Sequence, residues 1–212
     1  MPAAGASQDR TVTDNHHADA PSAYQRVSTI WPSLRRDAGE TPWLKRFASH
    51  LPTSGRVLDL GCGSGEPVAG WLLQNGFAVT GVDVALGMIA HAQAAHPKGE
   101  WFVADMRDLP DLGRFDGVLS WDGSFHLSRE EQKRALPRFA ELLRAGGTMM
   151  LTVGPDDGEV TGTVGEETVY HSSLSRDEYM SLLEPLFATV LHEPFDADPN
   201  GRHILLATGR KA

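Results

Sequence analysis

The sequence predicts one α/β domain built on a Rossmann-like, mostly parallel sheet. Short apolar runs alternate with helical segments between residues 56 and 153, which is the pattern of consecutive βα units. The first apolar run leads directly into three glycines at alternate positions, and acidic residues stand at or near the ends of three successive predicted strands. With 212 residues, the chain can form one α/β domain with a full core. We therefore expect residues 21–212 to form a single domain.

Composition and charge restrict the functions open to the chain. Nineteen Lys and Arg against 28 Asp and Glu give a net charge of −9, which opposes binding to the phosphate backbone of a nucleic acid. No apolar run approaches the length of a membrane helix and no signal pattern is present, so we expect a cytoplasmic protein without a membrane partner. The single cysteine, Cys62, cannot form an internal disulfide, and no spacing of residues predicts a metal site.

The first 51 residues precede the predicted sheet. Residues 1–20 lack apolar periodicity, which predicts a disordered N-terminal tail. Residues 21–51 are expected to form capping helices that cover the ligand edge of the sheet. The apolar residues expected on one face of these helices are Tyr24, Val27, Ile30, Trp31 and Leu34, and then Trp43, Leu44 and Phe47.

A glycine-rich turn follows the first predicted strand. Residues 56–67 read Arg-Val-Leu-Asp-Leu-Gly-Cys-Gly-Ser-Gly-Glu-Pro, so an apolar run passes into Gly61, Gly63 and Gly65 and then into a predicted helix. Glycine adopts positive φ without steric cost, which lets a ligand lie against the backbone, and the N–H groups of such a turn favour an anionic group. Dinucleotide-binding folds use Gly-x-Gly-x-x-Gly, whereas here Glu66 occupies the position of the third glycine.

Two further βα units bring acidic residues to the same edge of the sheet. Their predicted elements are a helix over 67–74, a strand over 77–82, a helix over 85–95 with Leu86, Met88 and Ile89 in the core, and a strand over 101–104. Asp83 follows Gly65 by 18 residues, close to the offset of about 20 at which an acid binds the ribose of a nucleotide. Together with Asp59 and Asp105, it forms a set of three acids at strand ends, where open α/β sheets bind ligands.

The second half of the chain continues the alternation and then departs from it. The predicted elements are a strand over 115–120, a helix over 129–144, a strand over 148–153, a helix after Ser175, and a strand pair over 187–191 and 203–208 joined by a turn at 198–201. Ser128-x-x-Glu131 and Ser175-x-x-Glu178 are capping boxes that begin the two helices. Residues 154–173 contain four glycines and only one short strand signal, over 168–171, so we expect a long loop that acts as a lid.

Several of these pieces together resemble one enzyme family. Asp-Leu-Gly-Cys-Gly-Ser-Gly at 59–65 resembles motif I of the class I S-adenosylmethionine-dependent methyltransferases, and Ala-Asp-Met-Arg-Asp-Leu at 104–109 matches a later motif. Trp-Asp-x-x-Phe-His-Leu at 121–127 and Tyr-His-x-Ser-Leu at 170–174 look like small-molecule methyltransferases of the type 11/25 kind. The resemblance covers residues 56–210 and implies a seven-stranded sheet of order 3-2-1-4-5-7-6 with helices on both faces.

The resemblance also assigns roles to residues at the motif positions. Asp83 would accept both ribose hydroxyls, Asp105 would accept from the adenine amino group, and Met106 would flank the adenine ring. The residues implied for cofactor binding are Asp59, Gly61, Cys62, Gly63, Gly65, Asp83, Val84, Met88, Asp105, Met106, Ser120 and Trp121. His126 is the candidate general base, with Asp122 and His171 as further candidates beside the acceptor.

Some of these residues have structural explanations that the sequence leaves open. His126 is explained equally well by packing ahead of the helix cap at Ser128. Cys62 is better explained as a small residue beneath the ligand than as a reactive thiol. Trp121 and Phe125 could attract a sulfonium by cation–π interaction, worth roughly 0.5–2 kcal/mol, and core packing explains Phe125 equally well.

The resulting prediction is an enzyme that transfers a methyl group from S-adenosylmethionine to an O, N or S nucleophile of a small molecule and leaves S-adenosylhomocysteine. Two alternatives remain at this point, namely an S-adenosylmethionine-binding protein without transferase activity and, less favoured, an NAD(P)-dependent oxidoreductase. The identity of the acceptor and the oligomeric state are not determined by the sequence.

Overall fold

The computed structural model describes residues 20–31, 42–193 and 202–212. The predicted N-terminal tail, except for residue 20, lies outside the described residues. So do Leu34 and the predicted turn at 198–201.

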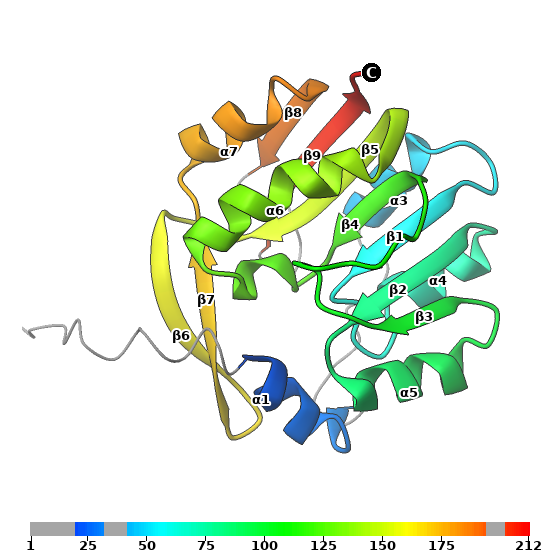
Figure 1. Cartoon of the computed structure of the whole chain (residues 1–212), viewed down its shortest axis with the longest axis vertical. Helices are drawn as coiled ribbons and strands as arrows, with labels where there is room; N and C mark the ends of the chain where they lie inside the picture. Colours follow the sequence, from blue (N-terminus) through cyan, green and yellow to red (C-terminus); the bar gives the residue numbers. More distant parts are fainter. Residues whose placement is uncertain (1–19, 32–41, 194–201) are drawn as a thin grey trace, which may run out of the picture.

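A seven-stranded sheet forms the centre of the molecule (Figure 1), in the order β3-β2-β1-β4-β5-β9-β8. Its strands are β1 (Arg56–Leu60), β2 (Ala78–Asp83), β3 (Glu100–Val103), β4 (Phe115–Ser120), β5 (Leu143–Val153), β8 (Phe187–Glu193) and β9 (His203–Arg210). Strands β1 to β5 are mutually parallel, whereas β9 pairs antiparallel with both β5 and β8. The predicted order 3-2-1-4-5-7-6 is confirmed. The last two strands are numbered β9 and β8 instead of 7 and 6 because the strands β6 and β7 of a separate sheet precede them in the chain.

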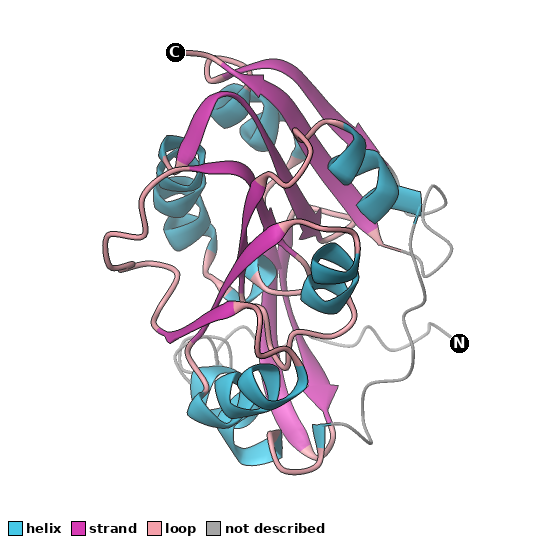
Figure 2. Cartoon of the chain, turned by 90° about the vertical axis from the view of Figure 1, so that its right-hand side faces the viewer, coloured by secondary structure: helices cyan, strands magenta, loops and turns pink. Residues whose placement is uncertain are grey.

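Helices cover both faces of this sheet, as Figure 2 shows from the side. One face carries α3 (Pro42–Ser49), α4 (Val68–Gln74) and α5 (Leu86–Ala95), and the other carries α6 (Arg129–Glu141) and α7 (Arg176–Leu183). Successive strand residues point to opposite faces, so Met149 and Leu151 of β5 pack beneath α6 and α7 while Met150 packs with α3 and α4. Burial on both faces explains why the strands read as continuous apolar runs.

The capping boxes begin the helices where the sequence predicted. The Ser128 side chain accepts from the Glu131 N–H, the Glu131 carboxylate accepts from the Ser128 N–H, and Ser175 and Glu178 repeat this arrangement. The predicted burial of Trp43, Leu44 and Phe47 on α3 is also confirmed. No described helix is both long enough and apolar enough to span a membrane.

The segment after β5 is not the predicted long loop. It forms an antiparallel hairpin of β6 (Gly158–Val164) and β7 (Glu167–Ser173), which stands apart from the main sheet (Figure 1). The tip of the hairpin lies beside α1 (Ala20–Val27), where Arg26 forms an ion pair with Glu167 at 2.7 Å. Val164 packs against a small cluster that contains Val27 of α1 and Met88 of α5. The hairpin and α1 therefore form one continuous wall.

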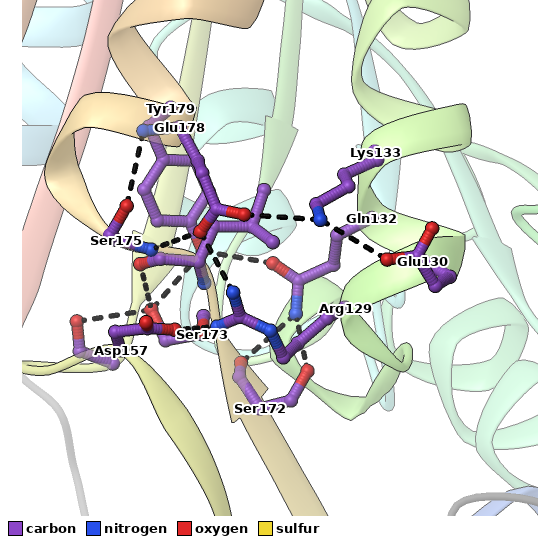
Figure 3. A network of polar contacts seen from close by, with 12 residues as sticks. Arg129, Glu130, Gln132, Lys133, Asp157, Ser172, Ser173, Ser175, Glu178 and Tyr179 are labelled. Atoms are coloured by element: carbon purple, nitrogen blue, oxygen red, sulfur yellow. Dashed lines mark hydrogen bonds and ion pairs between the residues drawn. The ribbon is translucent and has the colours of Figure 1, made fainter.

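A buried polar network fixes the base of this hairpin to α6 and α7 (Figure 3). The Gln132 amide, whose residue is 2% exposed, donates to the Ser172 carbonyl at 2.9 Å and accepts from the Tyr179 hydroxyl at 2.8 Å. Arg129 donates to the Ser173 carbonyl at 2.6 Å and pairs with Glu178 at 2.8 Å. Such satisfied networks specify one arrangement of the elements they join.

Two further predictions were wrong in detail. Helix α6 ends at Glu141 rather than at residue 144, and strand β5 begins at Leu143 rather than at residue 148. The reason is that Leu143 is buried and pairs with Phe115 of β4, before a shift in the register of the two strands. Leu86 was expected in the core but is 64% exposed. The buried side of α5 consists of Met88, Ile89 and Ala92, and Leu86 lies in the first turn, outside that side.

Candidate functional site

A cavity of about 520 Å³ lies at the carboxyl ends of β1, β2, β3 and β4. The predicted site residues that line it are Gly61, Gly63, Asp83, Val84, Met88, Asp105, Met106, Trp121, Asp122, His126 and His171. Residues outside the predicted set also contribute, among them Tyr24, Trp31, Arg107, Phe125, Val164 and Arg202. The cavity falls where parallel α/β sheets bind ligands and has the volume of a small-molecule site.

Four predicted site residues, Asp59, Cys62, Gly65 and Ser120, do not line the cavity. Asp59 and Cys62 are 2% and 5% exposed, and Ser120 is fully buried. The Ser120 hydroxyl donates to the Leu60 carbonyl at 2.7 Å and accepts from the Ser124 N–H at 2.9 Å, so it holds the loop after β4 against the end of β1. Burial raises the pKa of the Cys62 thiol well above its ordinary value, which favours the space-filling explanation.

The glycine turn exposes its backbone to the cavity. Gly61, Gly63 and Gly65 have φ values of 74°, 54° and 82°, which explains the requirement for glycine. A Cβ on Gly61 would lie 3.2 Å from the Met106 methyl group and 3.3 Å from the Cα of Gly123. Gly65 has a different function, because it packs against the His96 and Trp101 rings on the far side of the turn.

Asp83 joins this turn to the start of α5. Its carboxylate accepts from the Gly63 N–H at 2.9 Å through one oxygen and from the Ala85 N–H at 2.8 Å through the other. Burial raises the pKa of Asp83, and the two N–H groups oppose that effect. Each carboxylate oxygen can accept a further hydrogen bond, so Asp83 can hold the turn and also bind hydroxyl groups in the cavity.

Asp105 is held by Arg107, which was not among the predicted site residues. Arg107 Nε lies 2.9 Å from one carboxylate oxygen of Asp105, and Arg107 Nη1 lies 2.6 Å from Glu131. Burial acts to raise the pKa of Asp105, but its hydrogen bonds with Arg107 outweigh this and lower it. The spacing Asp-x-Arg was the available signal for this pair.

The loop after β4 contributes a second ion pair. Asp122 has a φ of 56°, and Arg202 binds its carboxylate with both Nε and Nη2, at 2.8 and 2.7 Å. The guanidinium also lies over the Trp121 ring at 5.1 Å, so one face of that ring is already covered. Arg202 immediately precedes β9 and is 80 residues away from Asp122 in the sequence, and no local sequence pattern indicates it.

His126 is hydrogen-bonded at both ring nitrogens. Its Nδ1 lies 2.8 Å from the Tyr170 carbonyl oxygen, and its Nε2 lies 2.8 Å from the Tyr24 hydroxyl. Burial lowers the pKa of His126 to about 4, although the hydrogen bond to Tyr170 partly opposes the shift. The imidazole is therefore neutral at pH 7.

Aromatic rings surround His126 in one part of the cavity, which we call the chamber. Phe125 and His171 lie with ring centroids 4.8 and 4.9 Å from that of His126, and Tyr24 packs edge-on against Trp31 at 5.7 Å. Burial also lowers the pKa of His171. The chamber therefore combines apolar ring surface with two neutral imidazoles. Among the described residues, no three His, Cys, Asp or Glu side chains are grouped to hold a metal ion.

Comparison with known proteins gives matches to methyltransferases. Residues 57–147 match the family described as "Methyltransferase domain". A putative methyltransferase of Bacillus subtilis (strain 168) is 33% identical over 44% of this chain and 38% of its own length. A putative methyltransferase of Geobacillus sp. (strain WCH70) is 31% identical over 61% of this chain and 57% of its own length. The chain thus matches less than two thirds of the length of either relative.

A solved structure matches the whole described fold. The 1,6-didemethyltoxoflavin-N1-methyltransferase of Burkholderia thailandensis, with bound 1,6-didemethyltoxoflavin and S-adenosylhomocysteine, superposes with a TM-score of 0.65. The match covers 100% of this chain and 93% of that protein, at 23% sequence identity. The likeness at this identity concerns the fold.

Proposed function

We propose that this chain, which has the class I methyltransferase fold and matches a methyltransferase domain at residues 57–147, transfers a methyl group from S-adenosylmethionine to a small molecule. One observation carries the proposal. A single cavity joins the glycine turn and the Asp83 carboxylate to an aromatic chamber that contains His126. A cofactor subsite and an acceptor subsite are thus continuous, which a transfer between two bound molecules requires.

The residues at the sheet edge fit the cofactor. The backbone at Gly61 and Gly63, which carries no side chain, can face the charged amino-acid end of S-adenosylmethionine. The Asp83 carboxylate can accept further hydrogen bonds from the ribose hydroxyls of the cofactor. Asp105 and Met106 line the part of the cavity proposed for adenine, where Arg107 keeps the Asp105 carboxylate ionised. When bound, S-adenosylmethionine would supply an activated methyl group on a sulfonium.

The chain's own contribution is to position the acceptor and exclude water. Tyr24 and Trp31 of the N-terminal segment and Val164 of the hairpin tip wall the chamber on the side away from the sheet. Enclosure of this kind aligns the nucleophile with the methyl group and removes competing water. Of the predicted catalytic residues, Asp122 already pairs with Arg202, and His126 and His171 are the two that line the chamber as candidate proton acceptors. The proposed base is His126, as the sequence predicted.

The test is formation of S-adenosylhomocysteine when the full chain is incubated with S-adenosylmethionine and small-molecule acceptors. Mass spectrometry of both the cofactor product and the methylated acceptor should show equal amounts. Binding of S-adenosylmethionine without turnover on hydroxyl, amine and thiol acceptors would favour a binding protein without transferase activity. Binding of NAD(P) in its place would favour the oxidoreductase alternative.

A further inference from the structure

The protonation of the His126 ring follows from its two partners. A carbonyl oxygen can only accept a hydrogen bond, so His126 Nδ1, 2.8 Å from the Tyr170 carbonyl, carries the ring proton. In the neutral imidazole, Nε2 is then the acceptor. The Tyr24 hydroxyl, 2.8 Å from Nε2, therefore donates its proton to that nitrogen. The lone pair that a general base needs is already engaged by Tyr24.

Contacts from three elements fix the position of Tyr24. The Tyr24 ring packs edge-on against Trp31 and against the His126 ring itself, at centroid distances of 5.7 and 5.1 Å. The helix α1 that carries Tyr24 is fastened to the hairpin by the Arg26–Glu167 ion pair. Directly after α1, the Ser28 carbonyl oxygen lies 2.9 Å from His91 Nε2 of α5, which fastens the end of this helix to α5. Tyr24 thus lines the same cavity as His126 and directly contacts His126 Nε2.

We propose that Tyr24, rather than His126, meets the acceptor, and that the two residues form a proton relay for an acceptor that enters as an uncharged hydroxyl compound. This inference rests on the proposed function. The acceptor oxygen forms its bond to the methyl carbon as the carbon–sulfur bond breaks, and the electron pair of that bond remains on sulfur. The acceptor proton passes to the Tyr24 oxygen, while the Tyr24 proton passes to His126 Nε2. The positive charge lost from the sulfonium therefore ends on the imidazolium, and no other reactant is needed.

The charge of the chamber supports an uncharged acceptor. Asp122 is neutralised by Arg202, and both His126 and His171 are neutral at pH 7 because burial lowers each pKa. The Phe125 and Trp31 rings line the same cavity, together with the apolar side chains of Val164 and Val169 from the hairpin. An aromatic ring can pack edge-on against such rings, so phenols are suitable probes.

The experiment compares two probe acceptors, phenol and pentafluorophenol, at pH 8. Phenol keeps its proton at this pH and needs a base, whereas pentafluorophenol is already ionised. The Tyr24→Phe variant keeps the aromatic ring and should lower kcat for phenol by roughly 10²-fold or more, with little change for pentafluorophenol. The His126→Ala variant should show the same selectivity. Since the two residues act as one unit, the double variant should be no slower than the slower single variant.

Tyr179→Phe is the matched control, because it removes a buried hydroxyl from the network at the base of the hairpin. It should lower the unfolding midpoint and leave kcat for both phenols within a few-fold of wild type. In the unliganded protein, Tyr24→Phe should shift the ¹⁵N resonance of His126 Nε2 while Nδ1 keeps its proton. An unchanged Nε2 resonance would show that the hydrogen bond is absent in solution and would overturn the relay.

The remaining outcomes separate this inference from the proposed function. If Tyr24→Phe lowers kcat equally for phenol and pentafluorophenol, Tyr24 is a packing residue. If the fold-losses in kcat of the two single variants multiply in the double variant, Tyr24 and His126 have independent roles. Each result overturns the relay and leaves methyl transfer intact. A wild-type protein that binds S-adenosylmethionine and methylates amines or thiols, but neither phenol, would overturn the acceptor class. A protein that does not bind S-adenosylmethionine would refute the proposed function itself.

Discussion

Replacing Gln132 with leucine should detach the base of the hairpin from α6 and destabilise the whole chain. Leucine has a similar size but no polar atoms, so the Ser172 carbonyl and the Tyr179 hydroxyl each lose a buried partner. A buried polar group left without its partner costs about 1–3 kcal/mol, and the apolar side chain recovers part of that cost. We expect the free energy of unfolding to fall by about 2–3 kcal/mol, which lowers the midpoint temperature by about 5–10 °C for a domain of this size.

Urea unfolding followed by circular dichroism and tryptophan fluorescence measures this loss. The midpoint should fall with little change in the slope against denaturant, because the surface exposed on unfolding is nearly the same. Lys133→Ala is the neighbouring control, since it removes only surface ion pairs with Glu130 and Glu178 and should leave the midpoint almost unchanged. If Gln132→Leu unfolds within about 0.5 kcal/mol of wild type, a typical surface effect, the network does not fix the hairpin.

Two further predictions concern the acid and the histidine of the site. Asp83→Ala should weaken S-adenosylmethionine binding by about 1–3 kcal/mol in calorimetry, because the Gly63 and Ala85 N–H groups and the ribose hydroxyls all lose an acceptor; unchanged affinity would exclude Asp83 from the site. The His126 pKa of about 4 lies below the unfolded value of about 6.5, so the unfolded state binds the extra proton between these pH values. Proton binding at His126 in the unfolded state should therefore lower the free energy of unfolding by up to about 3 kcal/mol as the pH falls from about 6.5 to about 4. Below about pH 4 both states bind the proton, so this residue causes no further loss. Urea unfolding at pH 7, 5.5 and 4 should show this loss in wild type and a smaller one in His126→Phe, and equal losses would contradict it.

Local patterns predicted the sheet and its helices well. The runs over 56–60 and 115–120 are apolar because helices cover both faces of β1 and β4, so their composition alone identifies them as strands. The capping boxes at Ser128 and Ser175 were correct because the residues that form each box lie three positions apart and need no tertiary partner. The strand order, in contrast, came from the family resemblance, because periodicity does not specify which strands are neighbours.

The hairpin was missed because its first strand carries no burial signal. Most of β6 is exposed, and Val160 in particular is 63% exposed, so no alternation of apolar and polar residues marks the strand. The usable signal was the two-residue turn between Val164 and Glu167, where Gly165 has a φ of 59°. This turn chemistry predicts a hairpin even where hydrophobicity does not.

The candidate site was predicted where it depends on strand ends or on the family motifs, such as those that contain His126 and His171. Gly61, Gly63 and Asp83 line the cavity because motif spacing places the two glycines directly after β1 and Asp83 at the end of β2. Tyr24 and Arg202 act on loop residues 102 and 80 positions away, and these pairings depend on how α1 and β9 pack. Sequence spacing contains no information about such contacts.

The proposed function is tested most directly by titrating the full chain with S-adenosylmethionine and, separately, with NAD in a calorimeter. The glycine turn lacks the third glycine of the dinucleotide pattern, and Glu66 occupies that position. We predict saturable one-to-one binding of S-adenosylmethionine and of S-adenosylhomocysteine, with no heat of binding for NAD. Saturable binding of NAD together with no binding of S-adenosylmethionine would contradict the account.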